Sequence, residues 1–92
     1  MSKVVVLGAG QWGTTMAQVL CDAGNHVLMW GRSQELVDEV NQKHTNSKYL
    51  DENVLPVGLK ATSSLKEAFE YSNIYVWWIL EHNRFVTINS KF

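Results

Sequence analysis

Short apolar runs, separated by amphipathic or polar segments, divide this chain into alternating strands and helices. Three of the runs, Lys3–Leu7, His26–Trp30 and residues 74–80, are rich in β-branched or aromatic residues and lack polar alternation. Such runs are typical of parallel strands that are buried on both faces of a sheet. A shorter run that includes residues 59–62 predicts a further strand, third in chain order.

The segment after the first strand predicts a helix over residues 14–23. Its apolar positions recur every three or four residues, which predicts one buried face. These positions are Met16, Val19, Leu20 and Ala23. Gly24 follows as the C-terminal stop, because helices commonly end at a glycine in the left-handed conformation.

Two further helices have recognisable starting signals. Ser33 is a candidate N-cap for a helix over Gln34–Lys43, and the sequence S-L-K-E at 64–67 matches a capping box for a short helix to about Tyr71. The sheet-facing positions of the first of these helices are expected to be Leu36, Val37 and Val40. The polar stretch 44–53 is longer than a minimal connection, and long loops are often functional.

A glycine-rich segment stands where the first strand meets the first helix. It reads Gly8-Ala9-Gly10-Gln11-Trp12-Gly13. In a G-x-G-x-x-G turn of this kind the first glycine permits the tight turn, the second lets a pyrophosphate approach the backbone, and the third lets the helix pack closely on the strand. The helix N-terminus attracts the anion. The motif predicts dinucleotide binding, and the alternative is a tight turn without a ligand.

The element order β-α-β-α-β-α-β indicates the α/β class. We expect a partial Rossmann-type parallel sheet with flanking helices, in the strand order 3-2-1-4, with the ligand at the carboxyl ends of the strands. Residues 1–80 would form this NAD(P)-binding domain, and residues 81–92 are an unassigned tail. The tail segment 84–89 is expected to pair with the fourth strand, which would otherwise be an exposed apolar edge.

The end of the second strand indicates which nucleotide is preferred. Sites for NAD usually place a carboxylate there, bonded to the ribose 2′-hydroxyl, whereas this chain has Arg32 and Ser33. A guanidinium forks onto phosphate or stacks on adenine, so Arg32 favours NADP(H), with NAD(H) as the alternative cofactor. Ser33 adds a hydroxyl contact. The opposing interpretation of Arg32 is a solvated loop charge.

Composition excludes several other functions. The chain has 92 residues, is 46% hydrophobic and carries a net charge of −1 with both signs interspersed, so neither a nucleic-acid nor a membrane surface is expected. Cys21 is the only cysteine, and the three histidines lack ligand-like spacing, so no metal site is expected. Met1 leads straight into a strand without a leader, which predicts a cytoplasmic protein.

Several motifs together resemble the N-terminal part of bacterial NAD(P)-dependent glycerol-3-phosphate dehydrogenase. They are V-L-G-A-G-x-W-G-T-x-x-A at 6–17, L-M-W-G-R at 28–32, N-Q-K-H-T-N at 41–46 followed by Tyr49-Leu50, and Leu55-Pro56. The resemblance covers about residues 3–76, and the tail 77–92 does not match. The resemblance implies a fragment that lacks the C-terminal catalytic domain.

The resemblance also implies roles for particular residues. Gln11, which stands where the family commonly has serine, and Trp12 would contact the cofactor at the glycine turn. Arg32 and Ser33 would contact its adenosine phosphate end, and Tyr49 is a further cofactor candidate. Family members use NAD(P)H to reduce dihydroxyacetone phosphate to sn-glycerol 3-phosphate for phospholipid synthesis, and full-length members are expected to be homodimers.

No catalytic residue is assigned to this chain, because the family's essential lysine lies beyond its last residue. Lys43, Lys48 and Lys60 are expected to be surface charges, and His44 is expected to order the H-T-N turn by hydrogen bonds. The unmatched tail reflects either local divergence or an out-of-frame sequence. Two alternative functions therefore stay open, an NAD(P)H-binding regulatory module and a non-functional truncated remnant.

Overall fold

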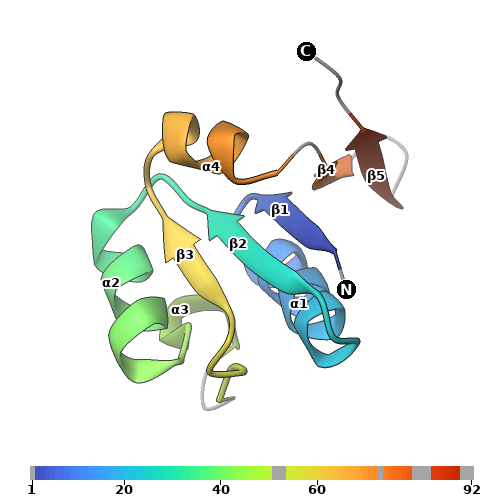
Figure 1. The fold of residues 1–92 in the computed structure, drawn as a ribbon. Coiled ribbons are helices and arrows are strands. Elements are labelled where there is room, and N and C mark those ends of the chain that lie inside the picture. The colour runs from blue at the N-terminus through green and yellow to red at the C-terminus, as the bar shows by residue number, and fades with distance from the viewer. Residues whose placement is uncertain (1, 51–53, 73, 80–83, 90–92) are drawn as a thin grey trace.

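The fold alternates strands and helices in the predicted order (Figure 1). The computed structural model describes residues 2–50, 54–72, 74–79 and 84–89. Its elements are β1 (Lys3–Leu7), α1 (Gln11–Asp22), β2 (His26–Trp30), α2 (Gln34–Lys43), α3 (Ser47–Leu50), β3 (Lys60–Thr62), α4 (Leu65–Tyr71), β4 (Ile74–Ile79) and β5 (Arg84–Asn89). Within these residues no helix is long and apolar enough to cross a membrane.

One sheet joins all of these strands in the order β3-β2-β1-β4-β5. The first four are parallel, which confirms the predicted order 3-2-1-4. β5 pairs antiparallel with β4, as expected for segment 84–89, and lies at the edge opposite β3 (Figure 1). β4 was predicted to include Leu80, which lies outside the described residues. Leu7 pairs with Trp30, and Trp30 with Thr62, so three strands end at one edge.

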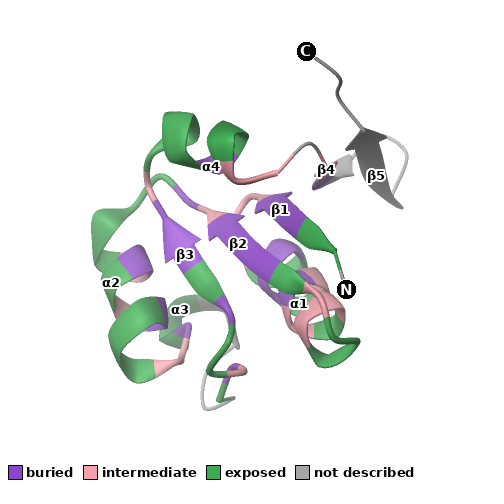
Figure 2. Cartoon of the chain, viewed as in Figure 1, coloured by how far each residue is buried: buried purple, intermediate pink, exposed green. Residues whose placement is uncertain are grey.

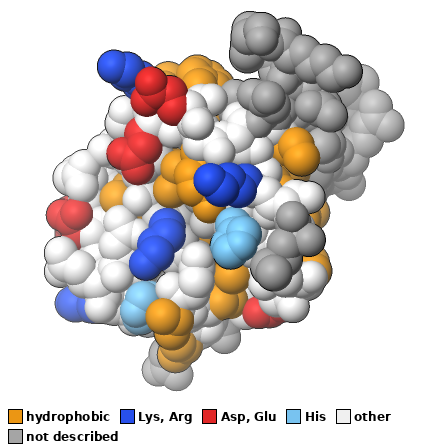
Figure 3. All heavy atoms as spheres, viewed as in Figure 1, with side chains coloured by type: hydrophobic (Ala, Val, Ile, Leu, Met, Phe, Trp, Pro, Cys, Tyr) orange, Lys and Arg blue, Asp and Glu red, His pale blue; other side chains and the backbone are white. Residues whose placement is uncertain are grey.

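Helices cover both faces of this sheet, and alternate strand residues face each side. α1 and α2 pack on one face around a core that includes Val6, Met29 and Val40. α4 packs on the other face, where Ala68 meets Val5. Figure 2 shows the buried residues concentrated in the strands, with exposed positions on the outer sides of the helices. Figure 3 shows basic and acidic side chains interspersed over one face of the molecule.

The predicted apolar face of the first helix is wrong at Val19 and Ala23, whereas Leu20 packs against the core as expected. α1 begins at Gln11 rather than residue 14, and its buried residues are Gly13, Thr14 and Ala17. Val19 is 55% exposed, Ala23 is exposed, and Met16 and Leu20 are half-buried. The helix lies so close to the glycine turn that only small side chains fit at the contact, so packing distance rather than hydrophobicity selects its buried face. The predicted stop is confirmed, since Gly24 has φ +98°.

The other helix starts follow the predicted capping. The Ser33 hydroxyl accepts a hydrogen bond from the Leu36 amide at 3.2 Å, and the Ser64 hydroxyl accepts one from the Glu67 amide at 3.2 Å. The Ser64 amide donates to Thr62 Oγ1, so this amide is bound by a threonine rather than by the glutamate of a full capping box. The polar stretch 44–53 was predicted to be a loop, but it contains the short helix α3.

Candidate functional site

A tight turn brings the end of β1 onto the start of α1. Gly8 adopts φ +123°, a backbone conformation that residues with a Cβ rarely adopt. Its amide donates to the Trp30 carbonyl at 2.8 Å. A Cβ on Gly13 would collide with the backbone carbonyl of Gly8. The predicted roles of these two glycines, the turn and the close helix packing, are therefore confirmed by the backbone.

The N-terminus of α1 is open toward solvent. Gly10 is its N-cap and is extended, and among the described residues no side chain caps the helix and no acid lies in its first turn. A Cβ built on Gly10 would meet no described atom within 4 Å. The first amides of a helix have no intrahelical partner and carry the positive end of the dipole. This end of α1 therefore fits an anionic group such as a phosphate that approaches the backbone closely.

A cavity of about 320 Å³ opens beside this helix end, at the carboxyl ends of β1 and β2. Its walls bring together Gly8, Gly10, Arg32 and Ser33, which the sequence predicted as site residues. The other residues that line it are Ala9, Trp30, Gly31, Leu36 and Lys48. A charged guanidinium thus shares one cavity with the open amides of the glycine turn.

The remaining predicted site residues lie elsewhere. Gln11 and Trp12 occupy exposed positions in the first turn of α1, where Trp12 is 55% exposed. Gly13 is buried behind the turn and supports it. Tyr49 lies in α3, and its side chain is outside the described part of the chain. The contacts predicted for Gln11, Trp12 and Tyr49 stay predictions.

The H-T-N segment, residues 44–46, follows the end of α2 and lies against the glycine turn. His44 is the C-cap of α2 in the left-handed conformation, with φ 57°. Its amide donates to the Val40 carbonyl at 3.1 Å, and its carbonyl accepts from the Leu55 amide at 2.6 Å. The backbone of His44 thus orders the turn by hydrogen bonds, as predicted, whereas its buried Nδ1 has no hydrogen-bond partner among the described residues.

Asn46 links this segment to the candidate site. It belongs to the H-T-N motif, but no role was predicted for it from the sequence. It is fully buried, and its Nδ2 donates to the Ala9 carbonyl at 3.0 Å and to Thr14 Oγ1 at 2.8 Å. The Thr14 hydroxyl also lies 3.2 Å from the Ala9 carbonyl oxygen, as donor. One amide therefore holds the glycine turn, the first helix and the H-T-N segment together.

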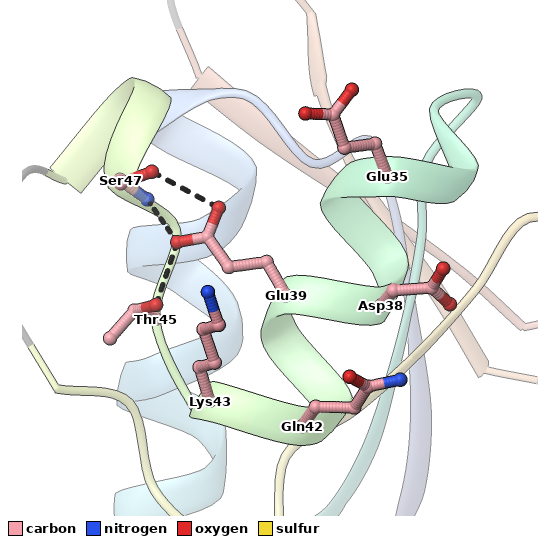
Figure 4. A pocket seen from close by; sticks show the side chains of 7 residues that line it. All are labelled: Glu35, Asp38, Glu39, Gln42, Lys43, Thr45 and Ser47. Atoms are coloured by element: carbon pink, nitrogen blue, oxygen red, sulfur yellow. Dashed lines mark hydrogen bonds between the residues drawn. The ribbon is translucent and has the colours of Figure 1, made fainter.

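Glu39 anchors the same segment from the other side, in a cavity of about 530 Å³ (Figure 4). Its carboxylate accepts hydrogen bonds from Thr45 Oγ1 at 2.6 Å, the Ser47 amide at 2.8 Å and Ser47 Oγ at 3.1 Å. The Thr45 hydrogen bond, followed by those from Ser47 and the nearby Lys43, lowers the pKa of Glu39. Figure 4 shows this carboxylate turned toward Thr45 and Ser47. Inside this cavity, Glu39 is therefore hydrogen-bonded to Thr45 and Ser47, and these bonds hold the start of α3 against α2.

Stability is expected to depend on the ionisation of Glu39. Because folding lowers its pKa, its contribution is present above the unfolded-state value of about 4.3 and is lost as the pH falls through the folded-state value. Glu39→Gln should therefore flatten the decline of the urea midpoint below that pH. Glu70→Gln on the exposed side of α4 is the matched control for loss of one carboxylate. If the urea midpoint falls equally steeply with pH in the Glu39→Gln and unsubstituted chains, the hydrogen bonds to Glu39 do not contribute to stability as proposed.

Known proteins similar to this chain are cofactor-dependent dehydrogenases. The family model described as NAD-dependent glycerol-3-phosphate dehydrogenase N-terminus matches residues 3–89, so it includes residues 77–89 of the tail for which the motifs showed no resemblance. Glycerol-3-phosphate dehydrogenase [NAD(P)+] of Streptococcus uberis is 52% identical over 71 residues, which cover 77% of this chain and 21% of that protein. The enzyme of the same name from Staphylococcus carnosus is 49% identical over 76 residues, covering 83% and 23%.

Solved structures similar to this chain are also those of glycerol-3-phosphate dehydrogenases. The crystal structure of glycerol-3-phosphate dehydrogenase from Coxiella burnetii matches with a TM-score of 0.75 and 35% identity, over 82% of this chain and 23% of that one. Glycerol-3-phosphate dehydrogenase from Plasmodium falciparum matches with a TM-score of 0.74 and 31% identity, over 82% and 24%. The chain thus spans less than a quarter of the length of these relatives.

Proposed function

Because this chain belongs to the family of NAD-dependent glycerol-3-phosphate dehydrogenase N-terminal domains, we propose that it binds NAD(P)H in the cavity between the glycine turn and Arg32. One observation carries the proposal. Gly8, Gly10 and Arg32 line a single cavity beside the uncapped N-terminus of α1. That arrangement offers backbone amides to a pyrophosphate and a guanidinium to the adenosine end of the same ligand.

The proposed role in chemistry is to present the reduced cofactor. By its resemblance to the family, the chain takes part in the reduction of dihydroxyacetone phosphate to sn-glycerol 3-phosphate, a phospholipid precursor. The nicotinamide supplies the hydride in that reaction. We assign the residues of this chain to holding and orienting the dinucleotide, and none of them to the proton transfer.

We further propose that NADPH is preferred over NADH. Arg32 and Ser33 follow β2, where an NAD site usually has a carboxylate. Opposite unit charges about 4 Å apart attract by roughly 4 kcal/mol at an effective dielectric near 20. Arg32 is exposed, so solvent screening leaves only part of that gain. The Ser33 hydroxyl accepts from the Leu36 amide, which leaves its proton to donate to a ligand oxygen.

Arg32→Ala tests this preference. We expect it to weaken NADPH binding about 30-fold, since a hydrogen bond to a charged group contributes about 2 kcal/mol. NADH binding should fall by less than about threefold, because a ribose 2′-hydroxyl carries no charge for Arg32 to neutralise. Calorimetric titration of both cofactors measures the two ratios.

Lys66→Ala is the matched control, because it removes one exposed positive charge from α4, on the other face of the sheet. It should leave both affinities unchanged. Equal losses for NADPH and NADH in Arg32→Ala would refute the phosphate role of Arg32, while saturable binding by the unsubstituted chain would still support the glycine-turn site.

A further inference from the structure

We propose that Lys48 determines cofactor specificity, as a second cation that binds the adenosine phosphate of NADPH together with Arg32. This inference rests on the proposed function and deepens it. The sequence indicated only a surface charge at this position, since α3 was not expected. In the fold, α3 brings Lys48 to the wall of the same cavity as Arg32 and Ser33.

Lys48 stands between two adjoining cavities. The first, of about 320 Å³, contains the glycine turn and Arg32, and the second, of about 240 Å³, continues along the start of α2. Ser33, Leu36 and Lys48 line both of them. A ligand that extends from the glycine turn past the end of β2 therefore occupies a cavity whose walls contain both Arg32 and Lys48.

The backbone that carries Lys48 is fixed on its N-terminal side. Asn46, two residues earlier, is fully buried and binds the Ala9 carbonyl at 3.0 Å. The amide of Ser47, directly before Lys48, donates to Glu39 at 2.8 Å. Because these contacts tie α3 to both the glycine turn and α2, ligand binding does not have to order this backbone. Such preorganisation reduces the entropic cost of a charged contact.

The charges that line the first cavity favour a strongly anionic ligand group, because Arg32 and Lys48 line it and none of its described lining residues is acidic. Of these two cavities, only the second has acidic residues in its described walls. Glu35 and Glu39 line the second cavity, and Glu39 already accepts three hydrogen bonds from Thr45 and Ser47. Glu35 is exposed in the first turn of α2. Arg32 and Lys48 thus present two cations where an uncharged ribose hydroxyl would gain little and a phosphate would gain from both.

Lys48→Gln tests the proposal with NADPH and NADH as the two probes. We expect the Kd for NADPH to rise about tenfold and the Kd for NADH to change less than about twofold, as for loss of a charge-assisted hydrogen bond at a partly solvated site. Lys48→Arg should retain most of the preference for NADPH. The affinity of Lys48→Gln for NADPH should also fall less steeply with added salt than that of the unsubstituted chain.

Lys60→Gln is the matched control, since it removes the same charge from an exposed position in β3. Circular dichroism of each variant checks that the fold is kept. If the unsubstituted chain prefers NADPH but Lys48→Gln loses both cofactors equally, or neither, the role of Lys48 is overturned and the proposed function stands. If the unsubstituted chain binds neither cofactor, both proposals fail.

Discussion

Gly13→Ala is expected to lower the free energy of unfolding by about 3 kcal/mol, the upper part of the range for overpacking a well-packed contact. The new methyl group would collide with the Gly8 carbonyl oxygen and would lie 3.0 Å from the carbonyl carbon. These are backbone atoms of a turn with a positive φ, so they cannot move aside as a flexible side chain can. Urea denaturation at pH 7 measures the loss.

Gly10→Ala is the matched control, because the same methyl group there meets no described atom within 4 Å. Its unfolding free energy should change by less than about 1 kcal/mol, the usual difference between glycine and alanine. It should nevertheless weaken NADPH binding, since the methyl group would stand where the phosphate is proposed to approach. If Gly10→Ala and Gly13→Ala destabilise equally, the packing role assigned to Gly13 is wrong.

Asn46→Ala is expected to destabilise the chain by about 3 kcal/mol, combining a lost buried hydrogen bond with the cavity that remains. Its Nδ2 serves both the Ala9 carbonyl and Thr14 Oγ1, and the side chain is fully buried. The substitution therefore removes the link between the H-T-N segment and the glycine turn. Urea denaturation reports the loss, and hydrogen exchange at the amides of residues 8–14 should become faster.

Asn25→Ala provides the comparison for Asn46. The Asn25 Nδ2 also donates to a backbone carbonyl, that of Leu20 at 3.0 Å, but the side chain is only partly buried. Water can replace that bond, so the expected loss is about 1 kcal/mol. A loss at Asn46 no greater than that at Asn25 would show that the glycine turn is held in place by other contacts.

The strands could be predicted from sequence because their signal is local. β1 and β2 were predicted with the bounds that the structure has, since a buried parallel strand is a short apolar run wherever it pairs. α2 was predicted equally well from Ser33 and the spacing of its apolar residues. The order of the strands followed from the alternation of elements.

The first helix shows where local pattern is insufficient. Its apolar spacing predicted burial of Val19, but the close approach to the turn at Gly8 turns Gly13 and Ala17 inward instead. α3 was missed for a related reason. Four residues do not form a helix by their own propensity. This helix is held by Glu39 of α2, which binds Ser47, and by Asn46, which binds the distant Ala9 carbonyl.

The residues of the candidate site likewise comprise some that the sequence could predict and some that depend on distant contacts. Gly8 and Gly10 were predicted from the G-x-G-x-x-G motif, and Arg32 and Ser33 from the segment that follows the second strand. They line one cavity because parallel strands end at one edge of the sheet. Lys48 was not predicted as a site residue, because it reaches the cavity only through a polar segment that hydrogen bonds fold back toward the glycine turn. Asn46 was not, since it contacts a residue 37 positions away.

The central claim is that the glycine turn and Arg32 form one dinucleotide site, and an NADPH titration of the 15N-labelled chain followed by amide chemical shifts tests it most directly. We predict saturable shifts concentrated at Gly8, Gly10, the first turn of α1, Arg32 and Ser33. Saturable shifts at another surface, or none in a chain that gives the dispersed spectrum of a folded protein, would contradict the claim.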